Sequence, residues 1–459
     1  MNNSTDHILD SSRDFALYTV KSRGIPALSD GLKDSQRKAL FLIKTHNSEI
    51  KTVSLAGEML SSLLYLHGDA SASETISMMA APFCNNVPLL QGIGAFGTKV
   101  GPKDWGAPRY TYVKQNQFTK DLIYTDFDII PMKENYDGSV MEPVHFLPII
   151  PMVLLNGVSG IAVGWSTDIL PHNLQDIVDA TLDAIDNKPV KELRPHYDYL
   201  SIIPKHLEGM SWNFEGKVKI DANLVYVKEL PPDLTLEKFK ARLNKMEDDG
   251  LIQTYTDSST STIDIEIRFK RGSIDSWDES KAIEFLKLKS KQTSRLVVLN
   301  WDSTSIKQYM TTSELITDFV NWRLEWYTTR YKKKKNDAII ELNWFSAIKE
   351  CHNKNLPDFL PKAANKTEII EQIKKICESI TTDHDVFDRL ASLPSYRWAK
   401  DYITEIDSKI ADLKKEIQNY DDILSDPKKR RSIYRKEVEA LKKLPTITRT
   451  VKQNKKQKK

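Results

Sequence analysis

Cysteine is scarce in this chain of 459 residues, which contains only Cys84, Cys351 and Cys377. Long stretches separate the three thiols and none belongs to a CxxC pair, so the sequence predicts neither a disulfide framework nor a structural zinc site. This cysteine usage is typical of a reducing compartment, and we expect a cytoplasmic protein.

Long hydrophobic runs are also missing. The longest apolar stretch, residues 146–155, is too short to cross a bilayer and contains two prolines. The first six residues are polar, so no secretory leader is expected. Hydrophobic residues make up 40% and charged residues 28% of the chain, which excludes wholesale disorder. At roughly 150 residues per domain, the length favours about three domains.

An excess of either sign of charge is nearly absent overall, because 66 basic residues stand against 63 acidic ones. The balance hides a gradient, because residues 428–459 contain fourteen Lys or Arg and two Glu, and the other 427 residues therefore carry a net −9. The basic stretch indicates either contact with a nucleic acid or contact with an acidic partner, and both interpretations stay open.

Two regions of the chain predict mixed α/β structure. Pro and Gly are dense from about residue 24 to 171, where helices are expected at 34–45 and 71–81. Between 200 and 310 the pattern changes to alternation with period two, at 217–227 and 262–269, which is typical of half-buried strands. Helices at 234–246 and 280–288 complete a predicted second, α+β domain.

The remainder of the chain predicts long helices. Residues 312–353 contain neither Pro nor Gly, and residues 401–426 carry apolar side chains close to heptad spacing with Lys and Glu between them. A smaller helical insert lies between the two stretches. This order predicts an antiparallel coiled-coil stalk with a knob at its tip.

Two apparent ligand motifs are interpreted as decoys. The string GIGAFG at 92–97 matches a dinucleotide fingerprint, but Gly101 and Pro102 follow too soon for the required helix. The pair Asp126 and Asp128 is weak evidence for a metal site, since a strand with two solvent-facing aspartates gives the same string. No Walker A loop occurs, so we expect this chain to bind neither a nucleotide nor a catalytic metal by itself.

Two other clusters have possible phosphate chemistry. Tyr110 follows Arg109, and a tyrosine hydroxyl can attack phosphorus while a guanidinium stabilises the charge on the non-bridging oxygens. Arg37 and Lys38 lie in the helix predicted at 34–45, with Lys33 just before it, and His67 precedes the helix predicted at 71–81. Basic residues beside a helix amino end can grip phosphates, although a solvated helix face has the same pattern.

The chain resembles the DNA breakage-and-rejoining subunit of type IIA topoisomerases, the class of gyrase A and eukaryotic topoisomerase II. The matching strings occur in family order over residues 23–173. They are RGIP at 23–26, DGLKDSQRKAL at 30–40, HGD at 67–69, LLQGIGAFG at 89–97, APRY at 107–110, NYDG at 135–138, PIIPMVLLNG at 148–157, GIAVG at 160–164 and PHN at 171–173.

The resemblance implies an α+β multidomain fold. Its expected parts are an N-terminal arm (1–26), a winged-helix breakage-reunion domain (27–173), an α/β tower domain (174–310), a long antiparallel coiled coil with a helical C-gate (311–445, knob 356–395) and a basic tail expected to be disordered (446–459). A short, separate cleavage subunit of this kind resembles those of T-even bacteriophage topoisomerases.

The resemblance also implies roles for individual residues. Tyr110 is expected to be the catalytic nucleophile that forms a transient bond to a 5′ phosphate, and Arg109 to brace the scissile phosphate. The expected DNA-binding residues are Lys33, Arg37, Lys38, His67 and the apolar wedge Ile161, which enters between base pairs. Two departures from the gyrase pattern, Gln36 and Tyr65, each replace a histidine.

The implied enzyme is an ATP-dependent type II DNA topoisomerase that acts on double-stranded DNA as a homodimer joined through the C-gate. Mg²⁺ and ATP are expected to bind mainly to a partner chain with ATPase and acidic (TOPRIM) domains, with no metal site in this chain. Relaxation of DNA is expected rather than supercoiling, because a DNA-wrapping domain is not recognised. The alternative is a non-enzymatic winged-helix protein that bends or scaffolds DNA, and Tyr110 discriminates between the two.

Overall fold

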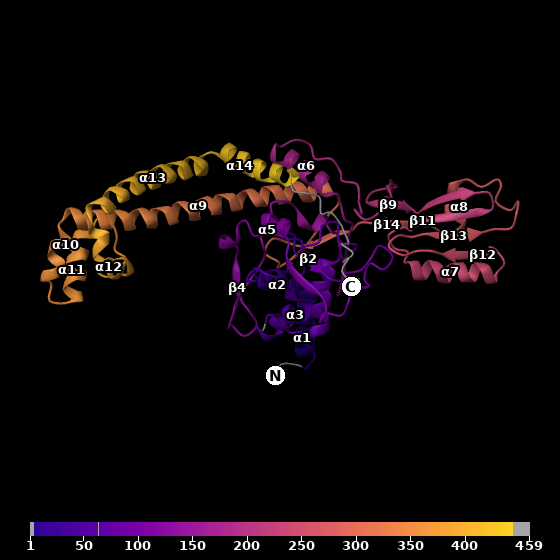
Figure 1. Cartoon of the computed structure of the whole chain (residues 1–459), viewed down its shortest axis with the longest axis horizontal. Coiled ribbons are helices and arrows are strands. Elements are labelled where there is room, and N and C mark those ends of the chain that lie inside the picture. The colour runs from indigo at the N-terminus through magenta and orange to yellow at the C-terminus, as the bar shows by residue number, and fades with distance from the viewer. Residues whose placement is uncertain (1–3, 63, 444–459) are drawn as a thin grey trace, which may run out of the picture. The chain divides into compact units, whose positions relative to one another are not determined.

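The computed structural model describes residues 4–62 and 64–443. Contacts divide the chain into two compact units, one comprising the chain up to Arg323 together with the chain from Arg435 onward, and the other comprising Leu324–Tyr434 (Figure 1). The predicted N-terminal arm contains the helix α1 (Ser4–Thr19) and the helical turn η1 (Val20–Gly24). The predicted basic tail, 446–459, lies outside the described residues.

Three helices and a small sheet form the core of the first unit's amino-terminal part. They are α2 (Asp34–Ile43), α3 (Thr52–Ser61) and α4 (Asp69–Ala80), with β1 (Ile50–Lys51), β2 (Leu90–Ile93) and β3 (Tyr112–Gln115). The sheet is antiparallel in the order β1-β3-β2. Each helix buries one apolar face, with Leu40, Leu55 and Ile76 fully inside, which confirms both helices predicted here.

Shorter elements continue this part of the chain. They are α5 (Gln117–Ile123), η2 (Phe127–Ile129), β4 (Met132–Glu134), β5 (Met141–Pro143), η3 (Met152–Leu154), β6 (Val158–Ala162), β7 (Trp165–Ile169) and α6 (Leu174–Ile185). The pairs β4–β5 and β6–β7 are antiparallel hairpins. Gly164 turns the second hairpin with φ of +76°, a backbone conformation that glycine adopts without strain.

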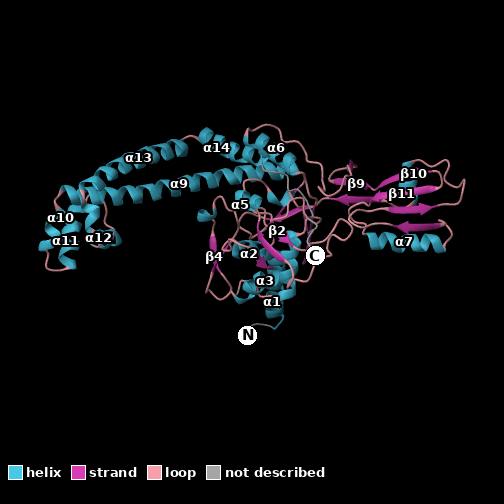
Figure 2. Cartoon of the chain, in the orientation of Figure 1, coloured by secondary structure: helices cyan, strands magenta, loops and turns pink. Residues whose placement is uncertain are grey.

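A second sheet region of the same unit has its own hydrophobic core. Its strands and helices are β8 (Lys205–His206), β9 (Ser211–Glu215), β10 (Lys217–Asp221), β11 (Leu224–Glu229), α7 (Leu236–Asp248), β12 (Thr254–Asp257), β13 (Ile265–Arg268), α8 (Glu279–Phe285), β14 (Lys289–Thr293), β15 (Leu296–Leu299) and β16 (Ile306–Tyr309). Four strands pair in the order β10-β11-β13-β12 (Figure 2). Val225, Val227, Ile265 and Ile267 are all fully buried at alternate positions, as the period-two pattern predicts.

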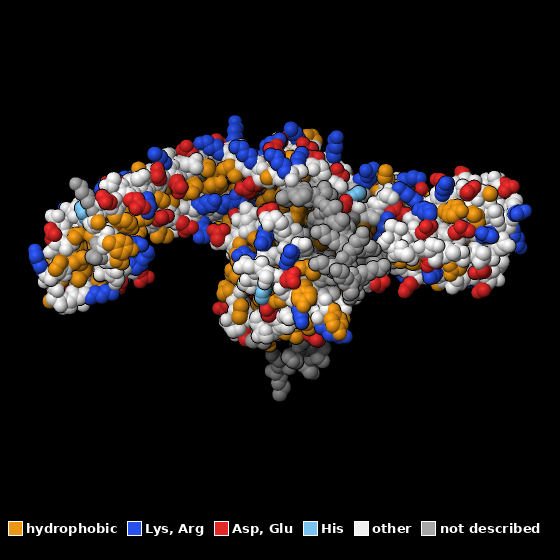
Figure 3. Space-filling model, in the orientation of Figure 1, with side chains coloured by type: hydrophobic (Ala, Val, Ile, Leu, Met, Phe, Trp, Pro, Cys, Tyr) orange, Lys and Arg blue, Asp and Glu red, His pale blue; other side chains and the backbone are white. Residues whose placement is uncertain are grey.

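The second unit consists of two long helices and a group of short ones. The long helices are α9 (Thr312–Asn353), which begins in the first unit, and α13 (Lys400–Ser425), followed by α14 (Pro427–Ala440). Lys335 pairs with Asp421 and Lys349 pairs with Asp407, so α9 and α13 run antiparallel. Hydrophobic side chains gather where these two helices face one another (Figure 3).

The helical insert between them contains α10 (Leu356–Phe359), η4 (Leu360–Lys362), α11 (Lys366–Cys377), α12 (His384–Ala391) and η5 (Ser395–Trp398), and η6 (Leu441–Lys443) follows α14. The insert shares a hydrophobic core with the ends of α9 and α13, in which Ile373, Ile406 and Leu390 are buried. No helix among the described residues combines the length and the apolar character needed to cross a membrane.

Candidate DNA cleavage site

Tyr110 lies in a tight turn immediately before β3, the central strand of the three-stranded sheet. The first turn of α3 holds this segment from the other side. The backbone N–H groups of Thr52 and Val53 donate to the carbonyls of Thr111 and Pro108, at 3.0 and 3.2 Å. The hydroxyls of Thr52 and Thr111 also bond at 2.9 Å in a buried position. The backbone around Tyr110 is therefore fixed by both a sheet and a helix terminus.

The Tyr110 side chain projects from this fixed backbone into solvent, with 70% of its surface exposed. Arg109 is also exposed, and its guanidinium carbon lies 4.8 Å from the centre of the Tyr110 ring. A guanidinium at that distance is attracted to the ring while its N–H groups stay available to an incoming anion. The pair therefore presents a hydroxyl and a forked cation together.

Arg37, by contrast, is buried, although the sequence predicts it to contact DNA. Its Nε donates to Asp30 Oδ2 at 2.7 Å, and a second guanidinium nitrogen donates to Asp30 Oδ1 at 3.0 Å. Burial acts to lower the pKa of Arg37, but the carboxylates of Asp30, Asp34 and Glu142 together raise the pKa above its ordinary value. Asp30 also accepts the N–H of Phe146, so the pair braces the interior instead of facing a ligand.

Lys38 is also committed to carboxylates. Its Nζ lies 2.8 Å from Asp34 and 3.3 Å from Glu142, and only 15% of the side chain is exposed. Burial acts to lower the pKa of Lys38, yet the two carboxylates raise it. This residue is charged and close to the surface, but its charge is largely neutralised within the protein.

Lys33 occupies the position before α2 and reaches across to the β6–β7 hairpin. Its Nζ donates to the carbonyl oxygen of Ser159 at 2.8 Å, while its backbone N–H donates to the Gln36 side chain. Burial lowers the pKa of Lys33. The backbone of Gly24 also lies so close to Gly160 that a side chain at either glycine would collide with the other segment. Lys33 and these glycines seat the hairpin against the amino-terminal segment.

Ile161 projects from this seated hairpin, on β6 opposite Ser166 of β7. Its side chain is 86% exposed, and Val163 and Trp165 beside it are 57% and 44% exposed. Exposure of three neighbouring apolar side chains is costly in water, and such groups are typical of binding surfaces. The hairpin therefore presents an apolar tip on a backbone fixed by Lys33.

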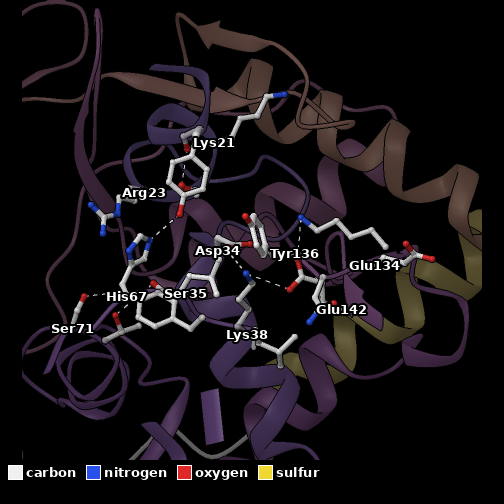
Figure 4. A pocket seen from close by; sticks show the side chains of 18 residues that line it. Lys21, Arg23, Asp34, Ser35, Lys38, His67, Ser71, Glu134, Tyr136 and Glu142 are labelled. Atoms are coloured by element: carbon white, nitrogen blue, oxygen red, sulfur yellow. Dashed lines mark hydrogen bonds and ion pairs between the residues drawn. The ribbon is translucent and has the colours of Figure 1, made fainter. Parts of the chain in front are cut away.

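His67 lies on the rim of a cleft of about 680 Å³ between η1, α2 and the β4–β5 hairpin (Figure 4). Its Nε2 is 2.9 Å from the hydroxyl of Tyr18, and the ring of Tyr65 packs edge-on at 5.0 Å. Partial burial, and then the charges of Arg23 and Lys38, lower the pKa of His67.

The cleft contains basic residues that the sequence patterns did not single out. Lys21, Arg23 and Lys133 line it, and Arg23 is exposed close to His67 (Figure 4). Arg23 opens the first family string, RGIP, which was the available signal. No signal in the sequence indicated Glu142, whose carboxylate pairs with Lys133 and also with Lys38, which lies far away in the sequence. The residues that line the cleft do not include Tyr110 or Arg109.

The apparent ligand motifs have structural explanations. No helix begins within residues 98–116, directly after Gly97, and the bridge between Phe96 and Trp105 closes a loop there. Asp126 is buried in an ion pair with Arg323, whose Nε donates to the carbonyl of Pro148 at 3.0 Å. Within residues 4–62 and 64–443, no group of three or more His, Cys, Asp or Glu side chains could hold a metal ion.

The chain is similar to known type II topoisomerases in both fold and sequence. The fold matches the structure of the topoisomerase II DNA-binding, cleavage and re-ligation domain of Plasmodium falciparum, with a TM-score of 0.79 at 24% identity over 94% of this chain and 63% of that one. The chain is 30% identical over 419 residues to DNA topoisomerase 2 of Invertebrate iridescent virus 6, and 30% identical over 322 residues to DNA topoisomerase 2-beta of Gallus gallus. These alignments cover 87% and 67% of this chain, but only 36% and 20% of the relatives.

The family itself follows from a match over nearly the whole chain. Residues 23–439 match the sequence model of the A subunit of DNA gyrase/topoisomerase IV. The chain belongs to this family, which confirms the resemblance to type IIA topoisomerases. It spans about a third of the length of the relative from Invertebrate iridescent virus 6.

Proposed function

We propose that this chain cleaves and rejoins duplex DNA as part of a type II topoisomerase, with Tyr110 as the nucleophile. The observation that carries the proposal is the geometry at Tyr110, an exposed hydroxyl on a backbone held by β3 and by the first turn of α3. Fixing a nucleophile before substrate arrives removes the entropic cost of positioning it during the reaction.

The chemical step follows from these groups. The Tyr110 Oη attacks phosphorus and forms a phosphotyrosyl bond, while the bond from phosphorus to the 3′ oxygen breaks. The phenolic proton is lost and the departing 3′ oxygen gains one. Charge builds on the non-bridging oxygens during this exchange, and the Arg109 guanidinium donates to them. Attack of the 3′ hydroxyl on the phosphotyrosine reverses the step and restores the strand, so no bond energy is lost to hydrolysis.

Ile161 and the exposed cations on the rim of the cleft beside His67 are proposed to hold the duplex for this step. Ile161 enters between base pairs and bends the DNA, at a cost of a few kcal/mol of unstacking that is offset by additional contacts. Lys33 positions the wedge hairpin through its bond to Ser159. His67 and Arg23 contact phosphates at the cleft rim, whereas Arg37 and Lys38 support the fold beneath them, because their charges are already paired.

The finer architecture and the partners are proposed on the family resemblance. We assign residues 27–173 to a winged-helix domain, 174–310 to a tower domain and 311–445 to a coiled coil with a C-gate that joins a homodimer. Mg²⁺ and ATP are assigned to a partner chain with TOPRIM and ATPase domains.

Relaxation of DNA is the proposed outcome of the reaction, and ATP-dependent supercoiling by the purified holoenzyme would contradict it. Equilibrium sedimentation of the full chain at the mass of a monomer, at micromolar concentration, would contradict the homodimer.

The decisive experiment traps the covalent intermediate. The chain is assembled with its metal-binding partner, Mg²⁺ and supercoiled plasmid, and then denatured. We expect protein attached to 5′ ends, lost by more than about 10³-fold in Tyr110→Phe because the nucleophilic oxygen is absent. Tyr396→Phe is a matched control, since Tyr396 is 66% exposed and also lies beside an arginine.

This result also separates the proposal from its alternative. A non-enzymatic DNA-bending or scaffold protein would bind the same plasmid and leave no protein on the ends. Full cleavage by Tyr110→Phe would show that another group is the nucleophile.

A further inference from the structure

Two of the three cysteines, far apart in the sequence, meet in the core of the helical insert. Cys351 lies in the last turn of α9, and Cys377 is the last residue of α11. Their sulfur atoms are 3.6 Å apart, and neither side chain has any exposed surface. Both are free thiols. A disulfide bond is about 2.05 Å long, so the two sulfur atoms must approach by about 1.5 Å to be joined.

The hydrogen bonds around the pair give the two thiols different characters. The Cys377 sulfur lies 3.9 Å from the carbonyl oxygen of Ala347, an acceptor. When Cys377 donates there, Cys351 is left to donate to the Cys377 sulfur. That bond lowers the pKa of Cys377 and raises the pKa of Cys351. Cys377 is therefore the better nucleophile, and the Cys351 sulfur lies within reach of the Cys377 sulfur once Cys377 has been oxidised.

We propose that Cys351 and Cys377 are a reversible oxidation site, which a two-electron oxidant such as a peroxide converts to an intramolecular disulfide. The Cys377 thiolate attacks a peroxide oxygen, and the O–O bond breaks to give a sulfenic acid and hydroxide, which takes up the thiol proton as water. The Cys351 sulfur then attacks the Cys377 sulfur and expels a second water. Two thiols are oxidised and one peroxide is reduced. This inference concerns only Leu324–Tyr434 and does not depend on the proposed function.

The bond would join covalently two helices, α9 and α11, that in the reduced protein meet through packing and through the weak hydrogen bonds of the two sulfurs. It would close the loop of chain from Cys351 to Cys377, which contains α10, η4 and α11 and contributes Leu356 and Ile373 to the core. A covalent closure of this kind removes open conformations in which the ends of α9 and α11 separate. Helix ends open locally more easily than helix interiors, which gives the oxidant its access to these buried thiols. The oxidised insert is therefore the more rigid one.

The test oxidises the full-length chain with hydrogen peroxide, blocks the remaining thiols under denaturing conditions and maps the peptides without reduction. We expect a cross-linked peptide containing Cys351 and Cys377, with Cys84 unlinked, and recovery of both thiols in dithiothreitol. Hydrogen exchange of the amides in α11 is expected to slow by about tenfold on oxidation. Cys84→Ala should retain the cross-link, and Cys351→Ala should lose it.

Three results would overturn the inference. They are sulfinic or sulfonic acids at these positions without a cross-link, disulfides between two copies of the chain, and thiols that stay reduced while Cys84 is oxidised. An unchanged exchange rate in the cross-linked protein would overturn the proposed stiffening. The wild-type peptide map gives the first answer by itself, so a variant that fails to fold does not obscure it.

Discussion

The amino end of α2 and the turn that carries Tyr110 are both basic in sequence, yet they differ in what their cations meet. In α2, Arg37 and Lys38 are neutralised by carboxylates within 4 Å. In the turn, Arg109 packs against a tyrosine ring, and among the described residues no carboxylate forms an ion pair with it. A basic string therefore identifies a charged region, but the acidic partners decide which of its cations are left for DNA.

The largest expected effect on stability comes from breaking the buried ion pair between Arg37 and Asp30. Replacing Arg37 in Arg37→Met leaves the Asp30 carboxylate buried without its main partner, and we expect a loss of about 3–5 kcal/mol in the free energy of unfolding. Urea denaturation followed by circular dichroism measures it. Lys133→Met is the control, since Lys133 is half exposed and its pair with Glu142 should contribute less than about 1 kcal/mol. Equal losses in the two variants would mean that burial of the Arg37 pair is unimportant.

Arg109 should behave in the opposite way. Arg109→Ala is expected to leave stability nearly unchanged, because the side chain is exposed, while covalent cleavage slows by roughly 10²–10³-fold. The rate at which protein becomes attached to 5′ DNA ends is the measurement. Arg109→Lys keeps the charge but not the forked donor geometry, so its cleavage rate should lie between those of the wild type and Arg109→Ala. Cleavage at the wild-type rate in Arg109→Ala would remove this residue from the chemistry.

Two histidines also differ in their surroundings, since His172 lies in the interior and His67 lines the cleft. His172 is fully buried, which lowers its pKa to about 4, and its Nδ1 donates to the carbonyl of Leu154. The unfolded chain takes up this proton below about pH 6.5, whereas the folded chain does so only near pH 4. Stability is therefore retained above pH 6.5 and falls by about 3 kcal/mol as the pH drops to 4.

Denaturation series at several pH values test this expectation. In His172→Asn the slope of stability between pH 4 and 6.5 should become shallower, since Asn keeps a donor but does not titrate. His67→Asn, at the cleft rim, should change that slope much less. An unchanged slope in His172→Asn would assign the acid sensitivity to other groups.

Much of the secondary structure was predictable from the sequence, because it depends on local patterns. The period-two strands around Val225 and Ile265 and the long helix from Thr312 to Asn353 follow from alternation and from the lack of Pro and Gly. The pairings were not predictable in the same way. Glu142 reaches Lys38, and Cys351 reaches Cys377, only after the chain has folded. The role proposed for Tyr110 rests on a family string, since no physical pattern in one sequence distinguishes it from sixteen other tyrosines.

The smallest expected effect concerns Ile161, the proposed wedge residue, whose side chain is exposed. Ile161→Ala should change stability by less than about 0.5 kcal/mol, because the side chain is 86% exposed and the hairpin is held by its backbone and by Lys33. Removing the wedge should reduce the bend in a bound duplex and slow cleavage by about tenfold, since less unstacking is achieved at the cleavage site. Energy transfer between dyes at the two duplex ends measures the bend. Val163→Ala, in the same hairpin and 57% exposed, should bend DNA nearly as the wild type does. If both variants bend DNA fully, the exposed apolar tip has another purpose, and exposure would no longer distinguish residues that act on DNA from those that support the fold.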